Sequence, residues 1–229
     1  MTDHAHDLRA VREATDRLLS ATRKLNDEDL ARPSRLPGWS RGHVVAHLSR
    51  NADALVNVLQ GRPMYADSET RERDIERGAP RPKAEQLADL ADSAARFADT
   101  ASAPADWSRT VTLRNGVTDS ASRIPFRRRV EVELHHVDLG IGYELEDLPD
   151  EFVTREIDFL TERFAGHSDV VSTEVVADDG RSWSTGGGAE GAPVVVRGSA
   201  GELLGWLCGR RDGSALTVDG GPLPALPPL

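Results

Sequence analysis

The sequence predicts an α+β protein in which an N-terminal helical bundle precedes a small C-terminal α/β domain. Two observations indicate this class. Apolar residues recur at helical spacing through much of residues 3–165. After residue 166, short β-branched runs and glycine-rich turns surround one further helix. We therefore expect domains over residues 1–166 and 167–229.

The boundaries of the expected helices follow from capping and breaking residues. Ser40 is a candidate N-cap for the second helix, which stops near Gly61. Pro125 falls in the first turn of the fourth helix and Gly140 at its end. The expected helices cover residues 3–25, 41–60, 84–100, 125–140 and 150–165; residues 66–77 form a short helix or a mobile loop, and 110–118 a hairpin that turns at Asn115-Gly116.

The C-terminal domain is expected to combine short strands with one helix. Ser199 and Glu202 have the spacing of a capping box at the start of that helix. The glycine-rich run 186–191 lacks the residues that complete a phosphate-binding loop, so a flexible loop is expected there. The expected strands cover 170–177, 193–196 and 215–218, and the helix covers 200–208.

Charge and composition limit the kinds of binding partner and indicate the cellular compartment. The net charge is −10, which disfavours nucleic acid and anionic membranes as partners. The only cysteine is Cys208, so no disulfide forms within the chain, and a reducing compartment fits. The first ten residues lack the apolar core of a signal peptide, and no apolar run is long enough for a membrane span. We expect a cytoplasmic protein, with a monomer favoured.

Two helices carry candidate metal ligands. Glu131 and His135 are four residues apart and project from one face of the fourth helix. His47 lies at the edge of the apolar stripe of the second helix, with His43 one turn earlier and further from the stripe. Zinc accepts imidazole nitrogen and carboxylate oxygen, and a catalytic zinc site uses three protein ligands and keeps one position open. Asp138 could orient His135 from behind. A Glu four residues before a His is also a common surface pair, and spacing alone leaves both interpretations open.

Three segments resemble the mycothiol-dependent maleylpyruvate isomerases. They are Leu36-Pro37-Gly38-Trp39-Ser40-Arg41-Gly42-His43-Val44-Val45-Ala46-His47-Leu48, Arg129-Val130-Glu131-Val132-Glu133-Leu134-His135-His136-Val137-Asp138-Leu139-Gly140 and Leu203-Leu204-Gly205-Trp206-Leu207-Cys208-Gly209-Arg210. The first two are shared with the wider DinB-like metal-binding superfamily, whereas the third is typical of the two-domain isomerases.

The resemblance implies a DinB-like four-helix bundle that carries zinc, joined to a small α/β domain. Transferred residue by residue, it places the ligands at His47, Glu131 and His135. It also places an essential arginine at Arg210, although Arg211 follows directly. Cys208 sits in an apolar helix end and is interpreted as a core residue rather than a nucleophile.

The activity implied by the resemblance is cis–trans isomerisation of maleylpyruvate to fumarylpyruvate in gentisate degradation, with zinc and mycothiol as cofactors. The expected partners are therefore a small dicarboxylate and a low-molecular-weight thiol, and Arg210 suits a carboxylate. Two alternatives stay open. One is a mycothiol S-transferase that acts on another electrophile, and the other is a non-catalytic, metal-dependent regulatory module on the same scaffold.

Overall fold

The computed structural model describes residues 4–103, 105–187 and 192–228. The chain forms two compact units, Met1–Tyr143 and Glu144–Leu229. Part of the expected glycine-rich loop, residues 188–191, lies outside the described residues.

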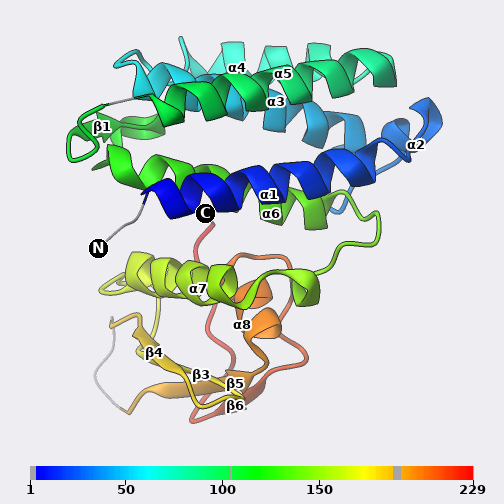
Figure 1. Ribbon diagram of the computed structural model, residues 1–229. Coiled ribbons are helices and arrows are strands. Elements are labelled where there is room, and N and C mark those ends of the chain that lie inside the picture. The colour runs from blue at the N-terminus through cyan, green and yellow to red at the C-terminus, as the bar shows by residue number, and fades with distance from the viewer. Residues whose placement is uncertain (1–3, 104, 188–191, 229) are drawn as a thin grey trace. The chain divides into compact units, whose positions relative to one another are not determined.

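The first unit is a helical bundle (Figure 1). Its helices are α1 (His4–Thr22), α2 (Asp27–Ala31), α3 (Arg41–Leu59), α4 (Ser68–Gly78), α5 (Lys83–Ser102) and α6 (Ile124–Asp138). The long helices α1, α3, α5 and α6 make up the expected four-helix bundle: α1 packs on α5 and α6, and α3 packs on the same two. The stretch expected as a short helix or a mobile loop forms α4, which packs against α3.

The bundle is held by one apolar core, because each long helix presents an apolar stripe to its neighbours. Leu18 of α1, Leu48 of α3, Leu90 of α5 and Val132 of α6 are all completely buried. Full burial of a side chain of this size contributes about 1.5–3 kcal/mol relative to exposure.

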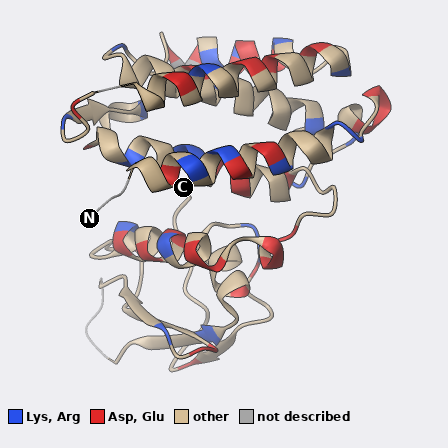
Figure 2. Cartoon of the chain, viewed as in Figure 1, with Lys and Arg blue, Asp and Glu red and all other residues tan. Residues whose placement is uncertain are grey.

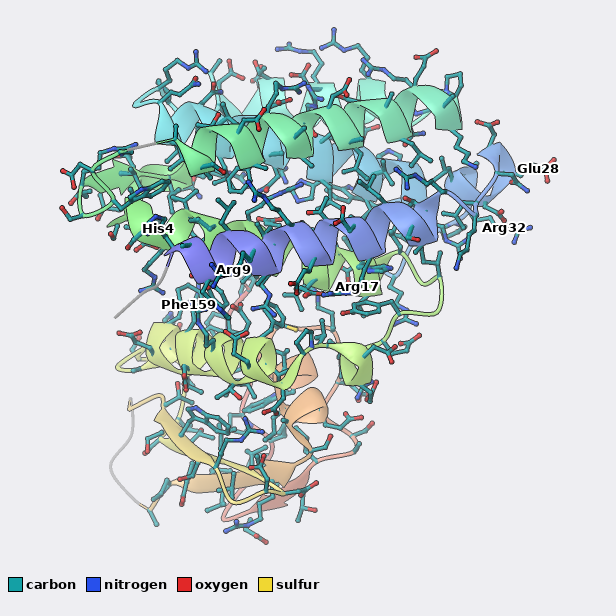
Figure 3. The ribbon with its side chains drawn as sticks, viewed as in Figure 1. His4, Arg9, Arg17, Glu28, Arg32 and Phe159 are labelled. Carbon is teal, nitrogen blue, oxygen red and sulfur yellow. The ribbon has the colours of Figure 1, made fainter. Side chains whose placement is uncertain are left out.

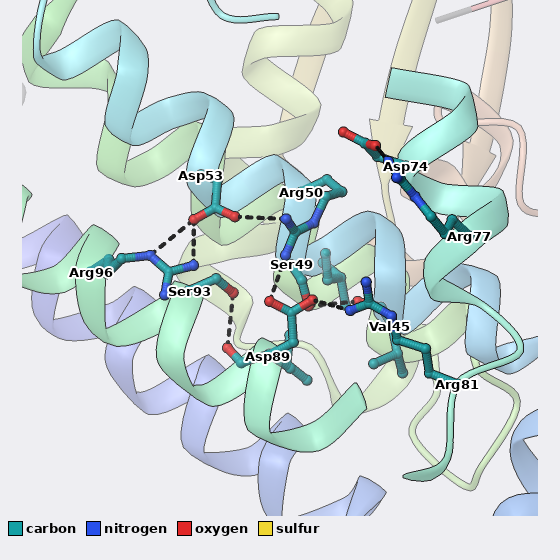
Figure 4. A network of polar contacts seen from close by, with 12 residues as sticks. Val45, Ser49, Arg50, Asp53, Asp74, Arg77, Arg81, Asp89, Ser93 and Arg96 are labelled. Carbon is teal, nitrogen blue, oxygen red and sulfur yellow. Dashed lines mark hydrogen bonds and ion pairs between the residues drawn. The ribbon is translucent and has the colours of Figure 1, made fainter. Parts of the chain in front are cut away.

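An ion-pair network links α3 to α5 on the side away from that core (Figure 4). Arg50 bridges Asp53 on its own helix, at 3.2 Å, and Asp89 on α5, at 2.5 Å. Arg96 of α5 returns to Asp53 at 2.6 Å. Partly exposed pairs of this kind each contribute at most about 1 kcal/mol, so the network orients the two helices more than it stabilises them.

The loops of the first unit depart from the sequence expectation in one place. The first helix ends at Thr22 rather than residue 25, and a separate short helix, α2, follows, because Asn26 forms a capping box with Asp29. The expected hairpin is present as β1 (Thr110–Thr112) and β2 (Thr118–Ser120), paired antiparallel. Asn115 and Gly116 both have positive φ, as predicted for its turn.

The second unit places helices against a mixed sheet. It contains α7 (Asp150–Phe164), α8 (Ala200–Leu207), β3 (Thr173–Ala177), β4 (Ser182–Thr185), β5 (Val194–Gly198) and β6 (Thr217–Asp219). The strand order is β4-β3-β5-β6, and only β3 and β5 are parallel. Strand β4 was not predicted, because its four residues Ser-Trp-Ser-Thr lack the apolar alternation that marks a strand.

The domain boundary differs from the expected one after residue 166. Helix α7 packs against α8 and β4 and therefore belongs to the second unit. The amphipathic pattern of α7 is the same whether the helix packs against other helices or against a sheet. The pattern alone therefore does not show to which unit α7 belongs. The expected capping box at Ser199 is only half formed: Ser199 accepts from the Glu202 amide, while the Glu202 carboxylate binds Arg211.

Charged side chains of both signs are interspersed along the helices of the first unit (Figure 2). Within the described part of the chain, none of the helices combines the length and the apolarity that crossing a membrane requires.

Candidate metal centre

Helices α3 and α6 bring together the three residues that the sequence proposed as ligands. Nε2 of His47 lies 2.9 Å from Oε2 of Glu131, and Nε2 of His135 lies 3.3 Å from the same oxygen. The two imidazole rings meet edge to face with their centroids 4.6 Å apart. The His47 and His135 side chains are 6% and 12% exposed, and that of Glu131 is 32% exposed. The two histidines are thus buried, while the Glu131 side chain is partly exposed.

Two arginine contacts fix the antiparallel register of α3 and α6 on either side of this cluster. At one end, Arg41 in the first turn of α3 donates to the carbonyls of Leu139 and Gly140, which follow α6, at 2.8 and 3.0 Å. At the other end, the fully buried Arg128 of α6 donates to the carbonyl of Leu48 at 2.9 Å and to Asn51 at 2.8 Å. A shift of either helix would break both sets of bonds, so His47 stays opposite the ligand pair on α6.

Asp138 contacts the His135 ring at Nδ1, the nitrogen that does not contact Glu131. Its Oδ2 lies 2.8 Å from Nδ1 of His135, and the residue is completely buried one turn further along α6. A carboxylate that accepts from Nδ1 fixes the orientation of the imidazole ring, with Nε2 directed at Glu131. The sequence proposed this orienting role for Asp138.

Three further side chains surround the cluster that spacing alone did not identify. The indole ring of Trp39 lies 5.5 Å, centroid to centroid, from the His47 ring. Nη2 of Arg71, in the first turn of α4, lies 3.2 Å from Nδ1 of His47. Arg71 also hydrogen bonds to Tyr65, whose pKa is raised by burial. One arginine in a charged stretch carries no sequence signal, and only the packing of α4 on α3 brings Arg71 to the cluster.

The protonation of two of the three candidate ligands suits metal ligation. Burial lowers the pKa of His47 to about 4, and the hydrogen bond to Glu131 offsets only part of that effect. Burial would raise the pKa of Glu131, but hydrogen bonds to His135 and His47 hold that pKa well below its usual range. At neutral pH, His47 is therefore uncharged and Glu131 is ionised. For His135, burial disfavours the charged form, but the carboxylates of Asp138 and Glu131 outweigh it and raise the pKa.

The donor set and its spacing fit a zinc ion. The ligand atoms of His47, Glu131 and His135 all lie within 4.8 Å of one another. Four ligands arranged tetrahedrally around zinc at about 2.0–2.1 Å are separated from each other by about 3.3 Å. The observed 2.9 and 3.3 Å separations therefore suit ligands that share one ion. The partly exposed Glu131 side chain lies on the side from which solvent reaches the cluster.

The neighbouring residues His43, Glu133 and His136 make contacts outside the metal-ligand cluster. His43 caps its own helix: its Nδ1 lies 2.7 Å from Oγ of Ser40, and it does not belong to the cluster. Glu133 is 1% exposed and accepts from Arg17 of α1, at 2.7 Å, and from Tyr143, at 2.9 Å; Arg17 is labelled on α1 in Figure 3. The ring of His136 stacks on Tyr143 at 4.1 Å. The contacts of Glu133 and His136 stabilise the side of α6 opposite to the cluster.

The two candidate arginines differ in their surroundings within the second unit. Nη1 of Arg210 donates to the carbonyl of Cys208 at 2.9 Å. Arg211 is held by two carboxylates, Glu146 at 2.6 Å and Glu202. Cys208 is buried in the helix end, as its interpretation as a core residue required.

The fold is a four-helix bundle that carries a candidate metal-ligand cluster and is followed by a second, α/β unit. Residues 11–140 match the profile of the mycothiol maleylpyruvate isomerase N-terminal domain, and residues 147–228 match that of the MDMPI C-terminal domain. The chain belongs to the mycothiol-dependent maleylpyruvate isomerase family, which confirms the resemblance seen in the sequence. The two matches also divide the chain close to Tyr143, where the compact units divide.

Solved structures share this fold. A crystal structure of a mycothiol-dependent maleylpyruvate isomerase superimposes with a TM-score of 0.90 at 24% sequence identity, over 99% of this chain and 97% of that one. A mutant of a mycothiol-dependent maleylpyruvate isomerase, with one histidine replaced by alanine, gives a TM-score of 0.89 at 23% identity, over the same shares of both chains. No curated protein sequence matches the chain significantly.

Proposed function

We propose that this protein is a zinc- and mycothiol-dependent isomerase that converts maleylpyruvate to fumarylpyruvate. The observation that carries the proposal is the cluster of His47, Glu131 and His135, oriented by the buried Asp138, in a chain whose two domains both match the isomerase family. We propose these three residues as the zinc ligands. Zinc bound there would keep a coordinated thiol in its nucleophilic thiolate form near neutral pH.

The chemistry requires temporary loss of a double bond. Addition of a thiolate to the carbon–carbon double bond of the substrate leaves a single bond that can rotate, and elimination of the thiolate then restores the double bond in the trans form. The role of the protein is to hold both reactants in one orientation. The open side of the cluster at Glu131 gives access for them, while the buried His47 and His135 keep the ligand positions fixed.

We propose Arg210 as the residue that binds a substrate carboxylate. A guanidinium can form two parallel hydrogen bonds to one carboxylate, which fixes the position and the plane of the group. The family resemblance places this role at Arg210, while the ion pairs of Arg211 with Glu146 and Glu202 give that neighbouring side chain a structural role within the second unit.

An assay of the zinc-loaded protein on maleylpyruvate, with and without mycothiol, tests the proposal. We expect fumarylpyruvate to form only when the thiol is present, with the thiol recovered unchanged. A parallel reaction with a generic alkylating agent addresses the S-transferase alternative. Accumulation of a thiol conjugate without isomerisation would refute the isomerase assignment in favour of the transferase.

A further inference from the structure

A cavity of about 660 Å³ opens in the first unit. It lies between the C-terminal end of α3, the connection 60–67 and the strand β1 with the turn that follows it. None of the proposed zinc ligands lines it. Its volume falls within the range of about 300–1,000 Å³ that is usual for small-molecule sites.

The wall of the cavity combines apolar surface with hydrogen-bonding groups. Val58 and Val111 contribute apolar surface, and both belong to the buried core of the bundle. Hydroxyl and amide groups come from Thr110, Thr112 and Asn115 on the hairpin. This mixture suits a ligand with many hydroxyl groups and apolar C–H faces, such as a sugar or a cyclitol. The lining also includes Asp67 and three arginines. Arg62 donates to Asn57 and Arg109 to the carbonyl of Leu59, so Arg114 is the arginine whose planar donors we assign to neighbouring hydroxyl groups of a ligand.

The cavity is connected to the metal cluster through two side chains. Tyr65 lines the cavity and hydrogen bonds to Arg71. Arg71 in turn lies 3.2 Å from Nδ1 of His47. Tyr65 and Arg71 thus form a hydrogen-bonded chain from the cavity wall to His47, which places the cavity beside the candidate metal ligands.

Size decides between the two reactants of the proposed function. Maleylpyruvate is a small keto-dicarboxylate and would leave most of a 660 Å³ cavity filled with water. Mycothiol carries its cysteine thiol on a body of glucosamine and inositol, to which the cysteine is joined by an amide bond. This body is large, uncharged and rich in hydroxyls. We propose that this cavity binds the glucosaminyl-inositol body of the thiol, with Thr112 and Arg114 on its wall. The assignment rests on the proposed thiol dependence of the protein.

Calorimetric titration of the zinc-loaded protein with N-acetylglucosaminyl-inositol tests the assignment. Its amine is acylated as it is in mycothiol, and without a thiol it cannot bind the metal through sulfur. Thr112→Trp fills the cavity from an exposed position on β1. Val117→Trp adds the same ring to the same hairpin at a residue that is 48% exposed and does not line the cavity. Equal thermal midpoints of the two variants establish that the hairpin stays folded.

We expect the wild type and Val117→Trp to bind the sugar with equal affinity, and Thr112→Trp to bind at least tenfold more weakly. The KM for mycothiol should rise in Thr112→Trp alone. Unchanged sugar affinity in Thr112→Trp would overturn the assignment, as would displacement of the bound sugar by maleate.

The outcomes also separate this inference from the proposed function. Mycothiol-dependent isomerisation by a protein that does not bind N-acetylglucosaminyl-inositol would overturn the cavity assignment and leave the function intact. Sugar binding that Thr112→Trp abolishes, in a protein without isomerase activity, would support the cavity and refute the isomerase.

Discussion

Nδ1 of His135 lies 2.8 Å from Oδ2 of Asp138, a carboxylate that has no solvent exposure. The contact joins two residues one helical turn apart, so α6 builds both the ligand and the group that orients it. Burial strengthens the contact, because no water competes for the carboxylate. The first prediction follows from this pair.

Asp138→Asn is expected to weaken zinc binding roughly 10–100-fold, which is the usual effect of removing the group that orients a ligand. The amide keeps the shape of the carboxylate but lacks its charge. Competition with a chromophoric chelator measures the zinc Kd. An affinity within twofold of the wild type would contradict the orienting role, provided that the thermal midpoint of the metal-free variant is unchanged.

His47→Ala is expected to abolish stoichiometric zinc binding, whereas His43→Ala should retain it. Both histidines lie on α3 one turn apart, but only His47 belongs to the ligand cluster, and His43 caps the helix start. Elemental analysis of the purified variants after dialysis gives the zinc content per chain. Equal zinc content in the two variants would refute the ligand assignment.

Zinc affinity is expected to fall as the pH is lowered through the pKa of His135. That pKa is raised above its ordinary value of 6.5, so at lower pH a proton occupies the imidazole in the metal-free protein and zinc must displace it. The loss should approach about tenfold per pH unit for this one proton. His47, with a pKa of about 4, adds no proton to displace until the pH is lower still.

The comparison variant for this pH profile is Asp138→Asn. Loss of the carboxylate that raises the pKa of His135 should move the decline in zinc affinity to lower pH. A profile that declines at the same pH in both proteins would contradict the cause assigned to the raised pKa.

Gly42→Ala is expected to destabilise the bundle by about 1–3 kcal/mol, as overpacking typically does. A Cβ at Gly42 would clash with the backbone carbonyl of Ala79, where α4 ends against α3. Gly201→Ala in α8 is the matched control, because its nearest neighbour would be 3.7 Å away. The control should be neutral or stabilised by up to about 1 kcal/mol. Thermal unfolding followed by circular dichroism measures both, and equal midpoints would contradict the close approach.

Arg210→Ala is expected to lower kcat/KM for the dicarboxylate substrate by about a hundredfold, because two charge-assisted hydrogen bonds are lost. Arg211→Ala should instead lower the thermal midpoint, because Glu146 and Glu202 lose their shared partner, while kcat/KM stays within a few fold. Steady-state kinetics with both variants checks this ranking. The opposite ranking would assign the substrate carboxylate to Arg211.

The sequence predicted most of the helices and their order because apolar spacing and breaking residues act locally. It did not predict the domain to which α7 belongs, because an amphipathic helix has the same pattern against a bundle or against a sheet. It also did not predict β4, whose residues lack the apolar alternation of a strand.

By itself, the sequence determined that Glu131, His135 and Asp138 share one side of a helix, because 3.6 residues complete each turn. The family resemblance then singled out His47 rather than His43. Only the tertiary structure decided that His47 meets the pair on α6, because Arg41 and Arg128 fix the register of two helices that are far apart along the chain. Only the tertiary structure brought Arg71 and Tyr65 to the cluster and formed the cavity beside it, since these depend on how α3, α4 and the hairpin pack.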